Sequence, residues 1–437
     1  MGLTDVQIGY AGIGLLLLLI ALRVPIGVSL ISVSFGGIWL LVGERAAWGT
    51  LGIVPYDFAA SWQLSSIPMF LLMGFFCYHA GLTKGLFDAA RVWFARLPGG
   101  LAVAAVFGSA GFAAVTGSSI ACAAAMGRIA VPEMMRHRYD PGFATGTVAA
   151  AGTIGALIPP SILMILYGII AQVPISQLFL GGTVAGLLTA FSYVAVIMIR
   201  TKINPRLAPH VEEHIGWRER FLALGDTWPV ILLILGVFGG LFSGLFSATE
   251  AGAVGATLAM LIALLKGSLN FKVVKDALVE TLLTSAALFI IAIGASMLSR
   301  FMAFSGAGDQ FAALIGGLGA DPVVLLIGIA FIYLILGMFL EPIGAMLLTL
   351  PIFLPIVGAA DMNLVWFGVL LAKFLEIGMI TPPIGLNVFV IKSVVGNLVS
   401  TGAIFRGIMW FLVADAVVVG LLITFPEVVL FLPRLLN

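Results

Sequence analysis

A short run of hydroxyl-bearing side chains interrupts one apolar stretch of the chain. In TGSSIACAAAMG (116–127), three hydroxyls surround a glycine that allows a tight turn; the four residues are Thr116, Gly117, Ser118 and Ser119. Hydroxyl and carbonyl oxygens can coordinate a sodium ion in an apolar environment without a ring of carboxylates. The run therefore predicts a turn that binds an ion or a polar substrate.

A carboxylate lies in a second apolar stretch. In LGMFLEPIGAM (336–346), Glu341 comes directly before Pro342. A carboxylate in hydrocarbon is costly, so such a residue is taken as functional by default. The alternative is that this loop lies closer to water than its apolar flanks indicate.

Two Pro-Pro pairs interrupt long apolar segments, in GTIGALIPPSI (152–162) and EIGMITPPIGL (376–386). Each proline lacks a backbone N–H and clashes with the preceding turn, so the helix is expected to open and free several carbonyls. Freed carbonyls in hydrocarbon are costly unless something binds them, and a sodium ion would do so. The alternative is a simple kink whose polar groups are satisfied by neighbouring hydroxyls.

These features recur at one offset. Shifting the sequence by 223 residues places Ser118 and Ser119 on Glu341 and Pro342, and it aligns five further pairs: Pro132 with Pro355, Pro159 with Pro382, Pro160 with Pro383, Ile154 with Ile377, and Gly155 with Gly378. The match predicts two copies of one unit. The alternative is that prolines simply recur in membrane helices.

The candidate residues must be positioned by membrane-embedded helices. The chain has 437 residues, of which 61% are hydrophobic and 9% charged, against about 25% charged residues in soluble domains. Lipid offers the backbone no hydrogen-bond partners, and long apolar runs without alternation favour helices over a barrel. We expect an all-α integral membrane protein with spans at about residues 6–22, 24–43, 64–82, 142–172, 175–199, 228–247, 251–265, 277–299, 364–395 and 403–424.

Two apolar stretches, 101–131 and 322–357, are interrupted near their middle by the polar residues and prolines described above. Each half is marginal or too short to cross a bilayer, which takes about 20 residues. A re-entrant helical hairpin, with both ends on one side of the membrane, accommodates such halves. The sequence therefore predicts an inverted-repeat transporter, with two re-entrant hairpins and two helices broken at Pro-Pro.

The distribution of basic residues tests this topology, because cytoplasmic loops are enriched in Lys and Arg. With the N-terminus outside, seventeen Lys and Arg residues fall on the inner face and three, Arg45, Arg300 and Arg434, on the outer face. Lys373 remains inside a span. The bias supports both hairpins and places the N- and C-termini on the outer side of the membrane.

This topology divides the chain into scaffold and transport units. The expected units are N-terminal scaffold helices (1–83), a first transport unit (84–172) with hairpin 101–131 and broken helix 142–172, scaffold helices with a cytoplasmic loop at 200–226 (173–299), a second transport unit (300–395) with hairpin 322–357 and broken helix 364–395, and a C-terminal scaffold helix (396–437).

Several other polar residues are expected to be structural. Lys373 and Glu376 are three residues apart, which favours a local ion pair. Glu250 follows Ser247 at a helix start, where a carboxylate is commonly structural. His210 and His214 are four apart in a charged loop without the metalloprotease order, so we expect them to be solvated. Residues 83–97 alternate apolar and basic residues at helical spacing, as an interfacial helix bracing the first hairpin would.

Some functions are disfavoured. The net charge of +1 gives no basic surface for nucleic acid. Cys77 and Cys122 lie in apolar stretches without disulfide or metal-ligand spacing, and no Walker A loop indicates ATP hydrolysis. We therefore expect a protein that is not an enzyme, with no cofactor besides coupling ions.

Five motifs resemble the large membrane subunit of TRAP (tripartite ATP-independent periplasmic) transporters, the DctM family of the ion transporter superfamily. They are TGSSIACAAAMG, AAGTIGALIPPSI, GLFSATEAGAVGA, LEPIGAMLLTLPIFLPI and EIGMITPPIGLNVFV. The resemblance covers nearly the whole chain. It implies a bacterial inner-membrane protein that takes up an organic acid with sodium by an elevator motion. It also implies two partners, a small four-helix membrane subunit and a periplasmic substrate-binding protein.

The resemblance also assigns residues position by position. Sodium site 1 would use Gly117, Ser118, Ser119, Gly152, Thr153 and Pro159, and sodium site 2 would use Gly337, Glu341, Thr381, Pro382 and Asn387; the substrate would contact Thr116, Ser119, Pro160, Ser161 and Pro383. Family members often carry Asp where Glu341 stands and a second Asp where this chain has Cys122. The second difference removes a charge and leaves the number of ions, and any role of protons, open.

Two alternatives remain. A stand-alone sodium/dicarboxylate symporter or antiporter of the same superfamily would share these motifs. A structural or proton-conducting subunit of a larger complex would carry charged residues through several adjacent spans, and here such residues are scarce. The sequence does not identify the substrate, because specificity in such systems resides largely in the binding protein.

Overall fold

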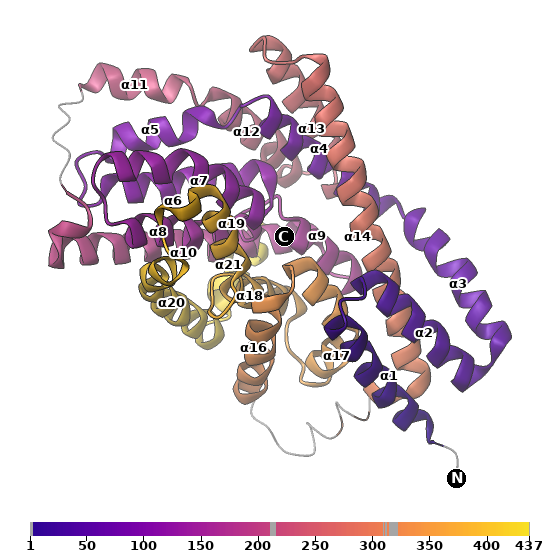
Figure 1. Cartoon of the computed structure of the whole chain (residues 1–437). Helices are drawn as coiled ribbons and strands as arrows, with labels where there is room; N and C mark the ends of the chain where they lie inside the picture. Colours follow the sequence, from indigo (N-terminus) through magenta and orange to yellow (C-terminus); the bar gives the residue numbers. More distant parts are fainter. Residues whose placement is uncertain (1–2, 210–215, 309, 311–312, 314–321, 437) are drawn as a thin grey trace.

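Figure 1 presents the chain as a computed structural model that describes residues 3–209, 216–308, 310, 313 and 322–436. Over these residues the chain forms α-helices, short 3-10 helices and connecting turns, and no strand. The all-α fold predicted from composition is confirmed. His210 and His214 lie outside the described residues.

By length and composition, six of the described helices could cross a membrane, or up to eight if two bent helix pairs each count as one span. The six are α10 (Ile175–Ile203), α13 (Ala248–Leu265), α14 (Phe271–Ser305), α16 (Pro322–Phe339), α17 (Pro342–Ala359) and α20 (Thr401–Thr424). The bent pairs are α3 (Glu44–Ala59) with α4 (Ser66–His79), and α11 (Trp217–Gly225) with α12 (Trp228–Phe242).

The remaining helices are shorter because turns or prolines end them. They are α1 (Asp5–Ala21), α2 (Ile26–Val42), α5 (Lys84–Phe94), α6 (Gly100–Thr116), α7 (Ser119–Arg136), α8 (Pro141–Gly152), α9 (Ile162–Ile170), α18 (Leu364–Gly378), α19 (Leu386–Val395) and α21 (Glu427–Leu435). The two long predicted spans at 142–172 and 364–395 are each divided in this way into two short helices.

The longest helix, α14, organises one side of the molecule. It packs against α1, α2, α3, α4 and α17, and it runs beside α2 in Figure 1. The side chain of Asn270 caps its first turn, where it accepts a hydrogen bond from the Val273 amide at 2.9 Å. Its C-terminal cap is Gly306, in the left-handed conformation.

The other side of the molecule is built around α8. This helix packs against α6, α7, α19 and α20, and α10 packs against α6, α18, α20 and α21. The core here is rich in alanine, and it includes Ala102–Ala105 of α6 and Ala149–Ala151 of α8, all buried. Small side chains allow close approach of helix backbones, which is the main way that membrane helices associate.

Several expectations for peripheral segments can be compared with this arrangement. The amphipathic segment 83–97 forms α5, which packs against α6 and α11, so the predicted bracing of the first hairpin is confirmed. Glu250 forms a capping box with Ser247 at the start of α13, as expected of a structural carboxylate.

Three helices were not predicted, and one of them is α11, which lies within the loop expected at 200–226. Residues 44–59 form α3, which packs on α2 and α14 although charged residues and Pro55 lower its hydropathy. Residues 427–435 form α21, which packs on α10 and α18. Helix α3 shows little periodicity of its own and is stabilised by tertiary packing. Helix α21 is short and amphipathic, and it follows the last predicted span.

Candidate functional site

The hydroxyl run forms the tip of a helical hairpin. Helix α6 ends at Thr116, Gly117 adopts a left-handed conformation with φ of 61°, and Ser118 caps α7. The Ser118 hydroxyl accepts a hydrogen bond from the Ala121 amide at 3.4 Å. A side chain at Gly117 would place its Cβ 2.0 Å from the carbonyl oxygen of Pro160, so only glycine fits this turn.

The second tip repeats this arrangement at the predicted offset. Helix α16 ends at Phe339, and Glu341 is the N-cap of α17. The Glu341 carboxylate accepts a hydrogen bond from the Gly344 amide at 3.2 Å. Residues 118 and 121 correspond to 341 and 344, so the offset of 223 relates the capping contacts as well as the sequence.

Both predicted helix breaks are present. The first break, residues 153–161, separates α8 from α9, and the second, residues 379–385, separates α18 from α19. The Pro159-Pro160 and Pro382-Pro383 peptide bonds are both cis.

Each hairpin packs against the broken helix of its own repeat. A Cβ built on Gly155 would lie 2.8 Å from the Ser119 Cα, and one on Gly378 would lie 2.7 Å from the Gly337 Cα. Gly155 and Gly378 are related by the repeat offset. The repeat therefore extends to the packing glycine, whereas its partner differs: Ser119 lies on the second arm of its hairpin and Gly337 on the first arm of the other.

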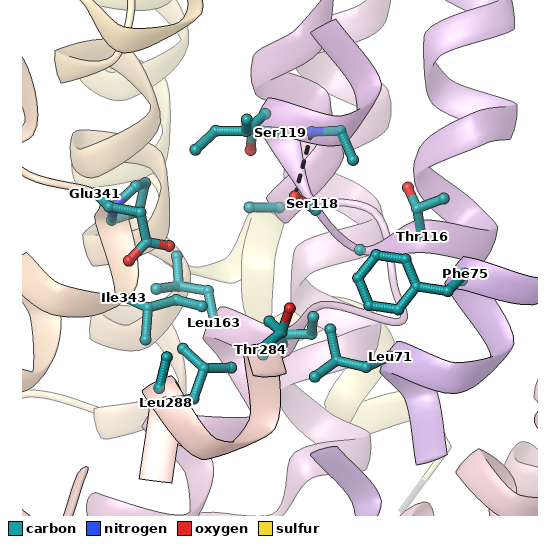
Figure 2. A pocket seen from close by; sticks show the side chains of 18 of the residues that line it. Leu71, Phe75, Thr116, Ser118, Ser119, Leu163, Thr284, Leu288, Glu341 and Ile343 are labelled. Atoms are coloured by element: carbon teal, nitrogen blue, oxygen red, sulfur yellow. Dashed lines mark hydrogen bonds between the residues drawn. The ribbon is translucent and has the colours of Figure 1, made fainter. Parts of the chain in front are cut away.

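The two tips line one cavity of about 630 Å³. In Figure 2, Glu341 faces the cavity from one side, and Ser118, Ser119 and Thr116 face it from the other. Its apolar wall comes mainly from α4 and α14, and includes Leu71, Phe75, Leu283, Ala287 and Leu288. A mostly apolar cavity with a few convergent polar groups is typical of a site for a small molecule.

The polar lining of the cavity is acidic. Glu280, Glu341 and Glu376 line it, and among the described lining residues there is no Lys, Arg or His. Helices α7 and α17 both begin at the cavity, because their N-caps Ser118 and Glu341 are lining residues. The cavity thus combines carboxylates with helix ends that favour an anion.

Comparison with known proteins identifies the family. The model of the tripartite ATP-independent periplasmic transporter, DctM component, matches residues 13–428. The chain belongs to the DctM family. It is 34% identical to the C4-dicarboxylate TRAP transporter large permease protein DctM of Pseudomonas aeruginosa, over 92% of this chain and 93% of that one. It is 30% identical to the sialic acid TRAP transporter large permease protein SiaM of Vibrio cholerae, over 94% and 95% of the two chains.

A solved structure shares the fold at low sequence identity. The transporter MtrF of Neisseria gonorrhoeae superposes with a TM-score of 0.60 and 15% identity, covering 96% of this chain and 95% of that one. The resemblance stated from the motifs is therefore confirmed, and this DctM-family permease is a multi-pass membrane protein with an all-α transporter fold.

The predicted site residues of the DctM-family permease are only partly brought together. Thr116 and Ser119, which were predicted as substrate contacts, both line the cavity. Ser161 is buried and caps α9 through the Met164 amide at 3.3 Å. The Pro160 carbonyl lies under Gly117, and Pro383 is exposed; neither proline is among the lining residues.

Three predicted sodium ligands direct their side chains elsewhere, and one of them, Thr381, donates its hydroxyl to the Ile377 carbonyl at 2.7 Å. The Thr153 hydroxyl donates to the Ala150 carbonyl at 2.7 Å and lies 3.2 Å from the Tyr193 hydroxyl. Asn387 was assigned to the second site, yet its amide donates to the Ala149 carbonyl of the first repeat at 3.4 Å. Asn387 thus lies where the two broken helices meet, and its own carbonyl oxygen has no partner among the described residues.

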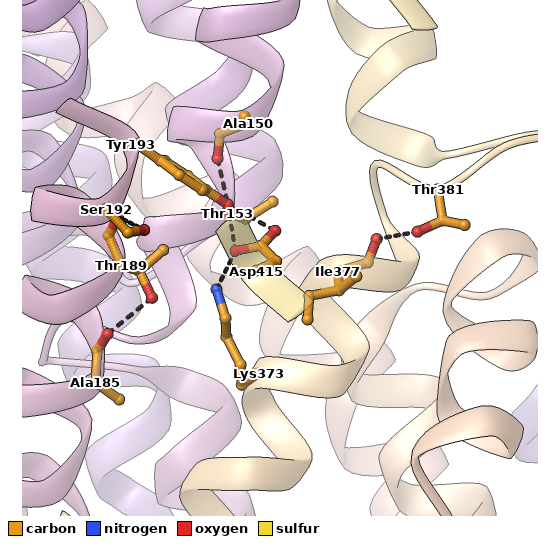
Figure 3. A network of polar contacts seen from close by, with 10 residues as sticks. All are labelled: Ala150, Thr153, Ala185, Thr189, Ser192, Tyr193, Lys373, Ile377, Thr381 and Asp415. Carbon is orange, nitrogen blue, oxygen red and sulfur yellow. Dashed lines mark hydrogen bonds and ion pairs between the residues drawn. The ribbon is translucent and has the colours of Figure 1, made fainter. Parts of the chain in front are cut away.

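The predicted ion pair between Lys373 and Glu376 is wrong. Lys373 instead donates to the carboxylate of Asp415 on α20 at 2.5 Å, and both side chains are fully buried. The Tyr193 hydroxyl also bonds this carboxylate, at 2.8 Å (Figure 3). Lys373 is therefore paired with a residue of a distant helix, and Glu376, without an ion pair to Lys373, lines the cavity.

Two buried carboxylates, Asp415 and Glu376, were not predicted from the sequence to have the positions that the structure gives them. Asp415 is the one acidic residue of the apolar span 403–424, and a charge at that depth was a signal for a buried partner. Glu376 was set aside because its spacing from Lys373 offered a simpler explanation. The competing partner of Lys373 lies 42 residues away and could not be read from local spacing.

Proposed function

We propose that this DctM-family chain is the transport subunit that couples sodium entry to the uptake of an organic acid. Its relatives are named for C4-dicarboxylate and for sialic acid, both of which are organic acids. The substrate class is inferred from these names together with the two helix N-termini at the cavity, since such ends favour carboxylates.

The observation that carries the proposal is the acidic cavity shared by the two hairpin tips. Glu341 and Glu376 line it without a basic lining residue in the described part of the chain. A carboxylate substrate entering it meets like charges in a medium of low dielectric constant, where repulsion is strong. Bound cations would remove that repulsion, so substrate binding and cation binding are expected to depend on each other.

The proposed ion sites follow the repeat. One would lie at the first tip with Gly117, Ser118 and Ser119 and the break that begins at Gly152. The other would lie at the second tip with Glu341, Gly337 and the break around Thr381. The close packing of each tip on its own broken helix supports this pairing. The substrate would lie between the tips, in contact with Thr116 and Ser119, which line the cavity.

The proposed motion is an elevator movement of the two hairpins and two broken helices across the bilayer. Helix α20 packs against α8 and α18, and α10 packs against α6, α9 and α18, which supports their inclusion in the moving body. This differs from the division drawn from the sequence, which places both helices in the scaffold. In this proposal the hairpins enter from opposite faces of the inner membrane, and both termini are periplasmic.

The proposed partners are a small four-helix membrane subunit and a periplasmic substrate-binding protein. The matched family is the DctM component of a tripartite system, which supports two further components. The exposed apolar surface of the described residues includes large side chains such as Leu40, Trp48 and Phe331, available to lipid or to a membrane partner.

Uptake by proteoliposomes tests the sodium sites. With the permease, its small subunit and the binding protein present, Ser119→Ala or Glu341→Gln is expected to lower sodium-stimulated uptake at least tenfold, because each removes an oxygen ligand or a charge. Ser65→Ala and Glu250→Gln are matched controls, since Ser65 is half-buried, Glu250 is exposed and neither lines the cavity. Normal uptake by both tip variants would contradict the proposed sites.

The same preparation separates the proposal from the stand-alone symporter. Uptake that requires the binding protein supports a tripartite system. Sodium-driven uptake by this chain alone would instead favour a symporter or antiporter of the same superfamily.

A further inference from the structure

Glu376 is a fully buried carboxylate without a hydrogen-bond partner. It lies two residues before the end of α18, its exposed fraction is 0%, and neither carboxylate oxygen is bonded by a described residue. The nearest basic side chain on the same helix, Lys373, is bound to Asp415. A buried carboxylate that no donor satisfies is costly unless a ligand provides compensation.

The carboxylate faces the tip of the other repeat. Glu376 and Ser119 line the same cavity, and the Ser119 hydroxyl lies close enough to the Glu376 carboxylate to interact with it, although no hydrogen bond of regular geometry joins them. Ser119 is 4% exposed, and its hydroxyl oxygen also has no partner among the described residues. Two buried, oxygen-bearing side chains from different repeats therefore meet at a cavity wall, and neither makes a regular hydrogen bond with another described residue.

We infer that Glu376 and Ser119 together bind a monovalent cation, so that the second repeat supplies the negative charge of the ion site at the first hairpin tip. This inference deepens the proposed function and depends on it. The other residues assigned to that site, from Gly117 to Pro159, contribute only neutral oxygens. The second site has its own carboxylate, Glu341, so with Glu376 each of the two ion sites has one.

The arrangement has a mechanical consequence. A cation held between Ser119 on α7 and Glu376 on α18 ties the first hairpin to the broken helix of the second repeat. Loss of the cation leaves Glu376 uncompensated beside Glu341 in the same cavity. Ion binding at one tip is thereby linked to the packing between the repeats.

Sodium titration of the full chain in detergent tests this inference without needing substrate or the binding protein. Thermal stabilisation is measured against sodium chloride, with choline chloride holding ionic strength constant. Glu376→Gln is expected to raise the sodium concentration for half-maximal stabilisation at least tenfold. Glu376→Asp, which keeps the charge, is expected to lie between Glu376→Gln and the unaltered chain. Glu250→Gln is the matched control, because Glu250 is exposed and caps α13.

The pairing of the two ligands is tested by a double-mutant cycle. If Ser119 and Glu376 hold one ion, the two substitutions are not independent. The double variant Ser119→Ala/Glu376→Gln is then expected to raise the half-maximal sodium concentration by a factor smaller than the product of the two single-variant factors. Independent effects would overturn the shared site. Should Glu376→Gln fail to fold, the Glu376→Asp and Ser119→Ala variants still form the cycle.

The outcomes distinguish the inference from the proposed function. If sodium chloride stabilises the chain no more than choline chloride does, the result contradicts both sodium coupling and the inference. A sodium response that Glu376→Gln retains unchanged would overturn the inference alone and leave coupling intact.

Discussion

At the scale of single residues, the chain places charge inside the molecule in two different ways. Lys373 and Asp415 form an ion pair at 2.5 Å, and the Tyr193 hydroxyl donates a further hydrogen bond to the Asp415 carboxylate. Glu376, three residues from Lys373, has no such partner in the described part of the chain. The first arrangement is a closed structural network, whereas the second leaves a carboxylate free for a ligand.

The buried pair gives a stability prediction. Asp415→Asn leaves the Lys373 charge without a counter-charge, which is expected to destabilise the protein by about 3–5 kcal/mol, measured by denaturation in detergent. The double variant Lys373→Met with Asp415→Leu removes both charges and is expected to recover most of that loss. A double variant as unstable as Asp415→Asn would show that the network does more than neutralise charge.

At this scale the sequence predicted the tip residues but not their neighbours. Ser118, Ser119 and Glu341 were identified because polar residues in apolar stretches are conspicuous. The partner of Lys373 depends on α20 lying beside α18, which is a tertiary contact. The position of Asn387 against Ala149 depends in the same way on α19 packing against α8.

At the scale of elements, glycines set the approach of helices. On α20, a Cβ at Gly407 would lie 1.9 Å from the carbonyl oxygen of Gly142 on α8. Farther along the same helix, a Cβ at Gly420 would meet nothing within 4 Å. The two glycines therefore form a matched pair with opposite surroundings.

This contrast predicts opposite effects of one substitution. Gly407→Ala is expected to destabilise the protein by about 1–3 kcal/mol, because the added methyl group pushes α20 away from α8. Gly420→Ala is expected to be neutral or stabilising by up to about 1 kcal/mol, from helix propensity. Thermal unfolding of both variants in detergent measures the difference, and equal effects would contradict the close packing of α8 and α20.

The helix breaks and hairpins could be predicted because proline chemistry acts locally. Both Pro-Pro pairs divide their helices, and both interrupted stretches form helix–turn–helix units. Helix α3 was not predicted because Glu44, Arg45 and Pro55 lower the hydropathy of its sequence. The contacts with α2 and α14 that stabilise it are not local in sequence. Local chemistry thus located the breaks, while packing determined the helices around them.

At the scale of the whole molecule, two related units converge on one acidic cavity. Their capping contacts and the glycines Gly155 and Gly378, on which the hairpins pack, follow one offset, so each tip and broken helix form one structural unit. The surrounding helices α4 and α14 complete the cavity wall. Alternating access, in this account, is movement of the paired units past that wall.

Labelling of single cysteines in sealed, oriented membrane vesicles tests this account most directly, in a chain whose Cys77 and Cys122 are replaced by alanine. Arg96→Cys and Arg138→Cys flank the first hairpin, and Phe304→Cys and Asp361→Cys flank the second. The account predicts that an impermeant maleimide modifies the first pair only from the cytoplasmic side and the second pair only from the periplasmic side. Modification of the two members of either pair from opposite sides would show a full crossing, and it would contradict the inverted hairpins on which the proposed ion sites depend.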